Sequence, residues 1–219
     1  MPGGNISMLC YKNGALAREQ IRDCYAAGDW DRFNQLVEVS PPGNNGYMGL
    51  YFPLPEIIPP NVIGDFFFSF GCTGHPRKAT LVDTIPVSAH PRAILESQLL
   101  SIRSRIAAIL PENAQPLQRL VITGGSSTNQ TILQLAADLF GMRVYVTTEL
   151  GSKEASCTGG AILAKYAWCR QMNVGPFGEM GPNRLKCVAE PTEVSKVYDR
   201  LLEVYRDCEE EVVRRQRPI

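Results

Sequence analysis

The stretch LVITGGSSTNQTILQLAADLFG, Leu120–Gly141, decides the fold class that the sequence predicts. Its apolar start is typical of a buried β-strand, and two glycines and three hydroxyl residues follow as a turn. Four apolar side chains then recur at the spacing of one helical face, namely Ile132, Leu135, Ala136 and Leu139. Gly141 is a typical stop for such a helix. The stretch therefore predicts a strand, a glycine turn and an amphipathic helix.

Helices and strands alternate on both sides of this stretch. Further helices are predicted at 15–27, 29–39, 91–110, 157–170 and 192–216. Strands are predicted at 65–71, 119–123 and 143–148, and over 6–14, where a short strand runs into an Asn-Gly turn. Residues 40–61, rich in Pro, Gly and Asn, are predicted to be loop with one short strand. The expected fold class is α/β in one domain, with parallel strand pairing around Leu120–Thr148.

Two of the predicted helices carry an apolar stripe that we expect to face the core. In 91–110 the stripe consists of Leu95, Leu99, Ile102, Ile106 and Ile109. In 192–216 it consists of Val194, Val197, Tyr198, Leu201 and Tyr205. Stripes at this spacing bury one helical face and leave the opposite face to water.

The composition excludes several classes of partner. The chain has 219 residues, and its 22 basic residues balance its 22 acidic ones, so no global charge favours nucleic acid or an anionic membrane. No apolar run approaches the ~20 residues that span a bilayer. Seven cysteines, an odd number without CxxC spacing, indicate reduced thiols in the cytosol. We therefore expect a cytoplasmic protein without nucleic-acid or membrane partners, and its oligomeric state stays open.

The glycine turn has several interpretations that the residues alone leave open. Gly124 and Gly125 lack a Cβ atom, so a flat ligand or another backbone can approach the helix N-terminus closely. Ser126 and Asn129 can cap the helix or hydrogen-bond a ligand. A Rossmann dinucleotide site would use Glu149 for the ribose, but the third glycine of GxGxxG is missing. A tight turn with a helix cap needs no ligand at all.

Three segments, in this order, resemble the C-terminal half of the FGGY carbohydrate kinases. They are RAILESQLLSIRSR (92–105), LVITGGSSTNQTILQLAADLFGMRVYV (120–146) and the glycine-rich SCTGGAILAKYA (156–167). Within that family, ISMLCYKNGALAREQIRD (6–23), followed by NNGYMGLYFPLPEIIP (44–59), is similar to D-xylulose kinases of the eukaryotic type. The resemblance covers nearly the whole chain, and its consistent order is more specific than any single motif.

The resemblance implies an actin-like, ribonuclease-H-like ATPase lobe, one half of a two-lobed kinase that closes over sugar and ATP. The implied reaction transfers the γ-phosphate of ATP to the 5-hydroxyl of D-xylulose, with Mg²⁺ held mainly through ATP and the other lobe. By resemblance Gly124, Gly125 and Ser126 contact the nucleotide, and Asn129 hydrogen-bonds its adenosine part. Trp30 falls where the xylulose kinases place an adenine-side tryptophan, although a half-buried aromatic anchor is an equal interpretation.

The resemblance also implies that the residues of phosphoryl transfer are missing. In the family the phosphate loops and the catalytic aspartate belong to the N-terminal lobe or lie ahead of this segment, and no aspartate here precedes glycine and a hydroxyl residue. Asp138 is interpreted as structural, and His75 and His90 as loop residues without catalytic partners. We interpret residues 1–219 as the nucleotide-side domain without its sugar-binding lobe, with no catalytic or metal-binding residue.

Two other classes of function remain in view. A non-catalytic interaction protein could keep the same fold for assembly, and a dinucleotide-binding domain of an oxidoreductase could share the strand, turn and helix. The kinase interpretation predicts that the pure 219-residue chain alone does not phosphorylate D-xylulose, and a coupled assay for ADP release checks this.

Overall fold

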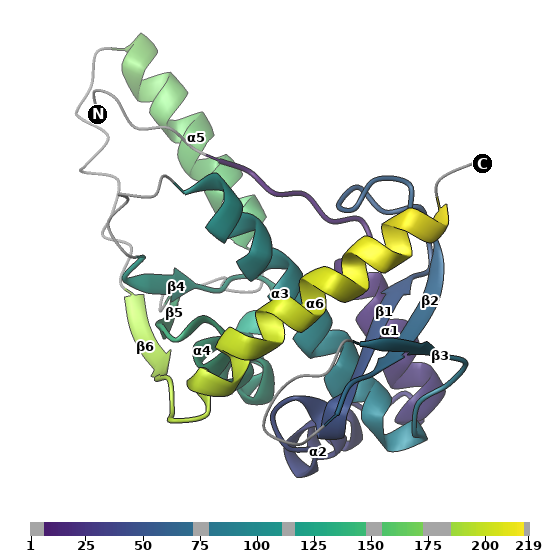
Figure 1. The fold of residues 1–219 in the computed structure, drawn as a ribbon. Helices are drawn as coiled ribbons and strands as arrows, with labels where there is room; N and C mark the ends of the chain where they lie inside the picture. Colours follow the sequence, from purple (N-terminus) through teal and green to yellow (C-terminus); the bar gives the residue numbers. More distant parts are fainter. Residues whose placement is uncertain (1–6, 72–78, 111–116, 148–154, 173–184, 217–219) are drawn as a thin grey trace. The chain divides into compact units, whose positions relative to one another are not determined.

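The computed structural model describes residues 7–71, 79–110, 117–147, 155–172 and 185–216. The chain divides into two compact units (Figure 1). Unit 1 comprises Met1–Gln115 and Val194–Ile219, and unit 2 comprises Pro116–Glu193. Each unit has its own sheet. That the whole chain forms one domain stays a prediction.

The sheet of unit 1 is an antiparallel meander of β1 (Tyr47–Phe52), β2 (Gly64–Ser69) and β3 (Thr80–Val82). β1 is the single strand predicted within 40–61, and β2 lies close to the strand predicted at 65–71. Nearly every residue of β1 is buried, which explains its almost continuous apolar sequence, YMGLYF. β3 was not predicted, because three residues give no readable alternation.

Four helices complete unit 1: α1 (Gly14–Tyr25), α2 (Trp30–Val39), α3 (His90–Ile109) and α6 (Ser195–Gln216). All four were predicted, α3 and α6 from their apolar stripes. α3 is central, because it packs against β1, α1, α2 and α6 (Figure 1). The strand predicted over 6–14 is wrong for the described residues 7–13, which form no strand. The backbone N–H groups of Lys12 and Asn13 donate to the Glu56 carboxylate instead of to a neighbouring strand.

The predicted stripe of α3 is only partly correct. Leu95 is buried, but Leu99, Ile102 and Ile106 are half-buried and Ile109 is 48% exposed. The first eight residues of the helix, 90–97, are instead buried on every side. Because four elements surround this part of α3, tertiary packing overrides the one-sided pattern that helical spacing predicts.

The predicted stripe of α6 is closer to the structure. Tyr198, Leu201 and Tyr205 are buried, as expected. The prediction that Val197 faces the core is wrong, because its side chain is 40% exposed. Val194 is half-buried and lies before the first residue of the helix. The stripe therefore starts one turn later than the spacing suggests.

A buried ion pair ties three helices of unit 1 together. Arg92 in α3 donates from Nη1 to the backbone oxygens of Val37 (2.8 Å) and Ser40 (2.7 Å) at the end of α2. Its Nε donates to Glu96 Oε1 at 2.7 Å, and its Nη2 donates to the Tyr198 hydroxyl of α6 at 2.8 Å. Because α2, α3 and α6 meet at one guanidinium, the packing of unit 1 depends on this side chain.

Glu96 completes the same network from the acidic side. Its Oε1 also accepts the Tyr198 hydroxyl at 2.9 Å and the backbone N–H of Gly43 at 3.1 Å. Burial raises the pKa of the Glu96 carboxyl, and the Arg92 guanidinium opposes this rise. Hydrogen bonds to both side chains therefore stabilise the two charges inside the core.

Unit 2 contains a second sheet, with β4 (Arg119–Val121), β5 (Arg143–Thr147) and β6 (Leu185–Ala189). β4 and β5 pair in parallel, which confirms the predicted parallel pairing, whereas the antiparallel β6 was not predicted. α4 (Gln130–Phe140) connects β4 to β5, and its four predicted apolar positions are buried. Gly141 ends α4 in the left-handed conformation, as predicted.

α5 (Ala155–Gln171) is the last helix of unit 2 and was also predicted. Most of its described side chains are exposed, including Leu163 and Trp168.

Asp138 has the structural role that the sequence suggested. Its Oδ1 accepts the backbone N–H of Thr192 at 2.7 Å and the Thr192 hydroxyl at 2.8 Å, and its Oδ2 accepts Gln134 Nε2 at 3.3 Å. The carboxylate is buried and joins the end of α4 to the segment after β6. The Asp138 side chain therefore stabilises the packing of α4 within unit 2.

Asp138→Ala is expected to destabilise unit 2 by about 1–3 kcal/mol, because two donors of Thr192 lose their acceptor. Hydrogen exchange of the α4 backbone amides measures the loss as reduced protection. Asp138→Asn is the control, since it keeps one acceptor oxygen and should cost less than alanine. Equal protection in the alanine variant and the parent would contradict the support role.

Candidate functional site

The glycine turn lies between β4 and α4, where Gly125–Thr128 form a single 3₁₀ turn. Gly124 has φ 75° and ψ −159°, a conformation that essentially only glycine adopts. The backbone N–H of Ser127 donates to the Gly124 oxygen at 3.1 Å, and the Ser127 hydroxyl donates to the same oxygen at 2.7 Å. The turn is thus fixed by its own hydrogen bonds and needs glycine at position 124.

The fold of the chain gives no reason for a glycine at position 125. The φ of Gly125 is not in the left-handed region, so its backbone would accept other residues. A Cβ added at Gly124 or Gly125 would meet no atom of the described residues within 4 Å. The turn therefore presents bare backbone to open space directly before α4.

Asn129 and Ser126 flank this bare backbone. Asn129 is the N-cap of α4, and its Oδ1 accepts the backbone N–H of Ile132 at 3.1 Å. This confirms the capping interpretation for Asn129, and its contact with adenosine stays a prediction. Both side chains are half-buried at the mouth of the helix, where unpaired N–H groups favour acceptor atoms of a ligand.

Trp30 belongs to unit 1, whereas the glycine turn belongs to unit 2. It begins α2 directly after Asp29, whose carboxylate caps the helix. The half-buried indole meets the Phe33 ring edge-on at 5.2 Å, and the Arg22 guanidinium lies 4.8 Å from the indole centroid. These contacts fit the aromatic-anchor interpretation, and a shared site with the turn stays a prediction.

His90 is not the loop residue that the sequence suggested. It is the first residue of α3 and only 3% exposed. Its ring stacks on Tyr25 at 3.8 Å, and its Nδ1 is hydrogen-bonded to the Tyr51 hydroxyl at 2.8 Å. Burial lowers the pKa of His90 to about 4, so the ring is neutral at pH 7. His75 lies outside the described residues.

No group of three or more His, Cys, Asp or Glu side chains in the described part of the chain could hold a metal ion. None of the helices described is long and apolar enough to cross a membrane.

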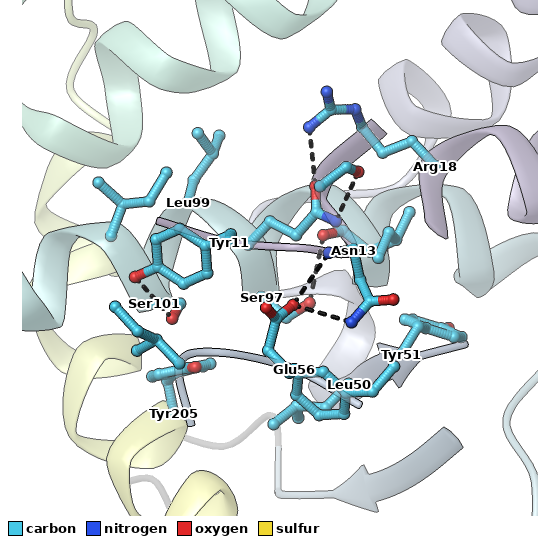
Figure 2. Close-up of a pocket in the computed structure, with 16 residues that line it drawn as sticks. Tyr11, Asn13, Arg18, Leu50, Tyr51, Glu56, Ser97, Leu99, Ser101 and Tyr205 are labelled. Atoms are coloured by element: carbon cyan, nitrogen blue, oxygen red, sulfur yellow. Dashed lines mark hydrogen bonds between the residues drawn. The ribbon is translucent and has the colours of Figure 1, made fainter. Parts of the chain in front are cut away.

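A pocket of about 110 Å³ lies within unit 1 and was not predicted (Figure 2). Its walls come from the segment before α1, from α1, β1, α3 and α6, and from the loop after β1. Sequence patterns could not reveal it, because residues as far apart as Tyr11 and Tyr205 line it. Figure 2 shows Tyr11 and Leu99 on one side and Arg18 and Tyr51 on the other.

Glu56 supports the pocket wall through four hydrogen bonds. Its carboxylate accepts the backbone N–H groups of Lys12 (2.6 Å), Asn13 (3.1 Å) and Ile57 (2.7 Å), and Asn13 Nδ2 at 3.0 Å. Burial raises the pKa of Glu56, but these donors outweigh burial and lower the pKa below its usual range. Glu56 is therefore ionised at neutral pH and fixes the segment that precedes α1.

Comparison with known proteins places this geometry in a family. The model of the C-terminal domain of the FGGY family of carbohydrate kinases matches residues 5–168, well over half of the chain. The chain belongs to this family. The match includes α1, the glycine turn and most of α5, so the predicted resemblance is confirmed. The strand, turn and helix of unit 2 thus belong to a carbohydrate-kinase family domain, and not to the dinucleotide-binding domain that the sequence also allowed.

Individual relatives agree with the family match. The chain is 32% identical to the xylulose kinase of Rattus norvegicus, over 97% of this chain and 38% of that protein. It is 37% identical to the xylulose kinase of Schizosaccharomyces pombe, over 73% of this chain and 30% of that protein. The chain therefore spans less than half the length of these relatives.

Solved structures confirm the fold. A ligand-bound xylulose kinase from Lactobacillus acidophilus superposes with a TM-score of 0.68 at 16% identity, over 93% of this chain and 39% of that one. Plasmodium falciparum glycerol kinase with ADP gives a TM-score of 0.56 at 15% identity, over 94% of this chain and 36% of that one. The chain thus has the actin-like α/β fold that the family resemblance implied.

Proposed function

We propose that residues 1–219 are the nucleotide-side domain of a kinase that transfers the γ-phosphate of ATP to the 5-hydroxyl of D-xylulose. The family match supports the reaction type, and the xylulose kinases among the relatives support the sugar. One observation carries the assignment of a nucleotide to this chain. Gly125 leaves open space before α4 although its backbone conformation does not require glycine.

The residues of the turn fit an adenosine. Open backbone at Gly124 and Gly125 lets a flat ring approach, and Ser126 and Asn129 lie beside it with polar atoms. The Trp30 ring is half-buried and offers an aromatic surface to a base. These groups would bind and orient ATP, and orientation alone lowers the barrier of phosphoryl transfer.

Magnesium enters this proposal through ATP. When bound, Mg²⁺ neutralises charge on the phosphates. The described residues contain no acidic cluster for it, so we assign the ion to ATP and to residues of the N-terminal lobe. The catalytic base and the sugar contacts are assigned to that lobe as well, which leaves this domain the task of holding the nucleotide.

Gly125→Leu is expected to weaken ADP binding at least about tenfold, because the added side chain fills the space that the ring needs. Isothermal titration of the 219-residue chain with ADP measures the change. Gly14→Leu is the matched control, since a Cβ at Gly14 likewise meets no described atom within 4 Å. Equal ADP affinity in both variants would contradict a nucleotide at the turn.

The interaction-protein alternative predicts no measurable ADP binding by the parent chain. Asn129→Asp distinguishes helix capping from ligand binding better than an alanine substitution would. The aspartate keeps the oxygen that caps α4 but removes the amide donor. Under the kinase proposal this variant binds ADP more weakly with unchanged helix stability. Parent binding to NAD stronger than to ADP would instead favour a dinucleotide site.

A further inference from the structure

The pocket of unit 1 contains none of the residues that we assign to the nucleotide (Figure 2). Its volume is about 110 Å³. Close-packed protein interiors leave few spaces of this size between side chains. Apolar cavities of about 150 Å³ in other proteins stay dry and bind benzene or xenon. The pocket of unit 1 is therefore of a size that takes one small organic molecule.

The apolar wall of the pocket comes from a strand and a helix. Leu50 and Phe52 of β1 and Ile94 of α3 line it, and all three are buried. Leu99 and Ile102 of α3 extend this wall and are half-buried. An apolar molecule on such a surface removes apolar area from water on both sides, which favours its binding.

Every polar side chain that lines the pocket already makes a hydrogen bond within the chain. The Ser97 hydroxyl donates to the Ile94 oxygen at 3.2 Å, and the Ser101 hydroxyl donates to the Tyr11 hydroxyl at 3.2 Å. The other such side chains are Asn13, Arg18, Tyr51, Glu56, Gln98 and Tyr205. In the described part of the chain, Asn44 Oδ1 is the only buried side-chain oxygen or nitrogen without a partner, and Asn44 does not line the pocket. Water needs two to four polar partners, so this lining offers little to water.

The two charged side chains of the pocket are engaged as well. Arg18 Nη1 donates to Gln98 Oε1 at 2.8 Å, and Glu19 stabilises the charge of the guanidinium. The Glu56 carboxylate accepts four N–H groups of the chain. A charged ligand would have to compete with these partners while it gives up its own water, which is costly in a partly buried site. The lining therefore favours an uncharged ligand.

Gly14 keeps one side of the pocket open. It is the first residue of α1 and lines the pocket. A Cβ added there would meet no atom of the described residues within 4 Å. The φ of Gly14 is not in the left-handed region, so its backbone does not require glycine. The glycine thus leaves room that a larger side chain would take.

We propose that this pocket binds a small uncharged molecule with an aromatic or branched aliphatic body. The body packs on Leu50, Phe52 and Ile94, and an aromatic ligand gains a ring contact with Phe52. The ligand makes no hydrogen bond that the binding depends on. Its affinity therefore follows the apolar area that it buries, and a charge on the ligand weakens binding.

Benzene is the probe, and benzoate and benzylammonium are its charged counterparts. The 219-residue chain, labelled at its Ile and Leu methyl groups, is titrated with each up to about 10 mM and followed by NMR. Benzene is expected to shift the methyl resonances of Leu50, Ile94 and Ile102, with a dissociation constant of about 1 mM or below. The methyl resonances of Ile132, which is buried in unit 2, should not move. Both charged probes are expected to bind at least about tenfold more weakly than benzene.

Two substitutions fill the pocket from different sides. Gly14→Leu adds a side chain from α1, and Ser97→Leu adds one from α3. Each should weaken benzene binding at least about tenfold. Gly14→Leu is the safer of the two for the fold, because leucine favours a helix more than glycine does. Gly125→Leu is the matched control and should leave benzene binding unchanged, since Gly125 does not line the pocket.

The proposal is overturned if benzene shifts none of the three pocket residues, or if it shifts Ile132 as strongly as it shifts them. Benzene binding that neither Gly14→Leu nor Ser97→Leu weakens overturns it as well. An affinity for benzoate or benzylammonium that equals the affinity for benzene overturns the assignment of an uncharged ligand. The ADP titrations use Gly125→Leu as the test and Gly14→Leu as the control. Because the two variants exchange these roles here, a failure of the pocket is distinct from a failure of the nucleotide proposal.

Discussion

Arg92→Met is expected to lower the free energy of unfolding of unit 1 by about 3–5 kcal/mol. The substitution keeps the side-chain volume but removes four hydrogen bonds, to Val37, Ser40, Glu96 and Tyr198. The Glu96 carboxylate would then remain buried without its counter-charge. Leaving one buried charge unpaired costs much more than the pair itself contributes.

Urea unfolding followed by the fluorescence of Trp30 measures this loss in unit 1. A Trp168→Phe background removes the signal of unit 2, and Trp168 is exposed enough for this change to be mild. The double variant Arg92→Met with Glu96→Gln should recover about 1–3 kcal/mol, since it no longer buries a lone charge. Arg103→Met, which breaks only the more exposed pair with Asp199, is the control and should cost less than about 1 kcal/mol. A loss below that limit for Arg92→Met would contradict the central role of the network.

Acidification from pH 7 to pH 4 is expected to remove about 3 kcal/mol of the stability of unit 1 through His90 alone. The pKa of His90 is about 4 in the folded chain and 6.5 in the unfolded chain. Between these values the unfolded state binds the proton more readily. The stability from the neutral ring is therefore fully present above pH 6.5 and is lost as the pH falls toward 4.

His90→Phe is the matched control for this pH dependence. Phenylalanine keeps a ring against Tyr25 and cannot titrate, although it gives up the hydrogen bond to Tyr51. His75 is present in both proteins, so its contribution cancels in the difference. The pKa of Glu56 is lowered from 4.5, so its loss of stability begins only as the pH falls below that value. Parallel stability profiles of the two proteins between pH 6.5 and pH 4.5 would exclude the buried neutral histidine.

The sequence predicted unit 2 best around the glycine turn. α4 begins and ends where its cap, apolar spacing and Gly141 indicate, although its second half is buried on every side and not on one face alone. The parallel pairing of β4 and β5 followed from the helix between them. β6 was missed because its five residues, LKCVA, carry no strict alternation.

Unit 1 was harder to predict because its segments are fixed by distant partners. The segment 7–13 has the composition of a strand, yet the backbone N–H groups of its last two residues donate to Glu56, more than 40 residues away. The buried start of α3 includes the charged pair Arg92 and Glu96, which no spacing rule places in a core. His90 looked like a loop residue because its aromatic partners, Tyr25 and Tyr51, lie in other elements.

The candidate sites divide in the same way. The glycine turn is contiguous, so its residues could be read directly from the sequence. Its relation to Trp30 rests on family resemblance, since the two lie in different units. The pocket of unit 1 is built from four separate stretches of the chain, and only their packing creates it.

The order of the two units along the chain has a consequence for synthesis on the ribosome. Unit 2 lies between the two parts of unit 1, so Tyr198 follows its partner Arg92 by 106 residues. At about 5–20 residues per second, those residues take about 5–20 s to be made. During that interval Arg92 and Glu96 lack their hydrogen-bond partner Tyr198, whereas all residues of unit 2 are synthesised before Tyr198. The Arg92 network of unit 1 therefore cannot be completed before α6 has left the ribosome.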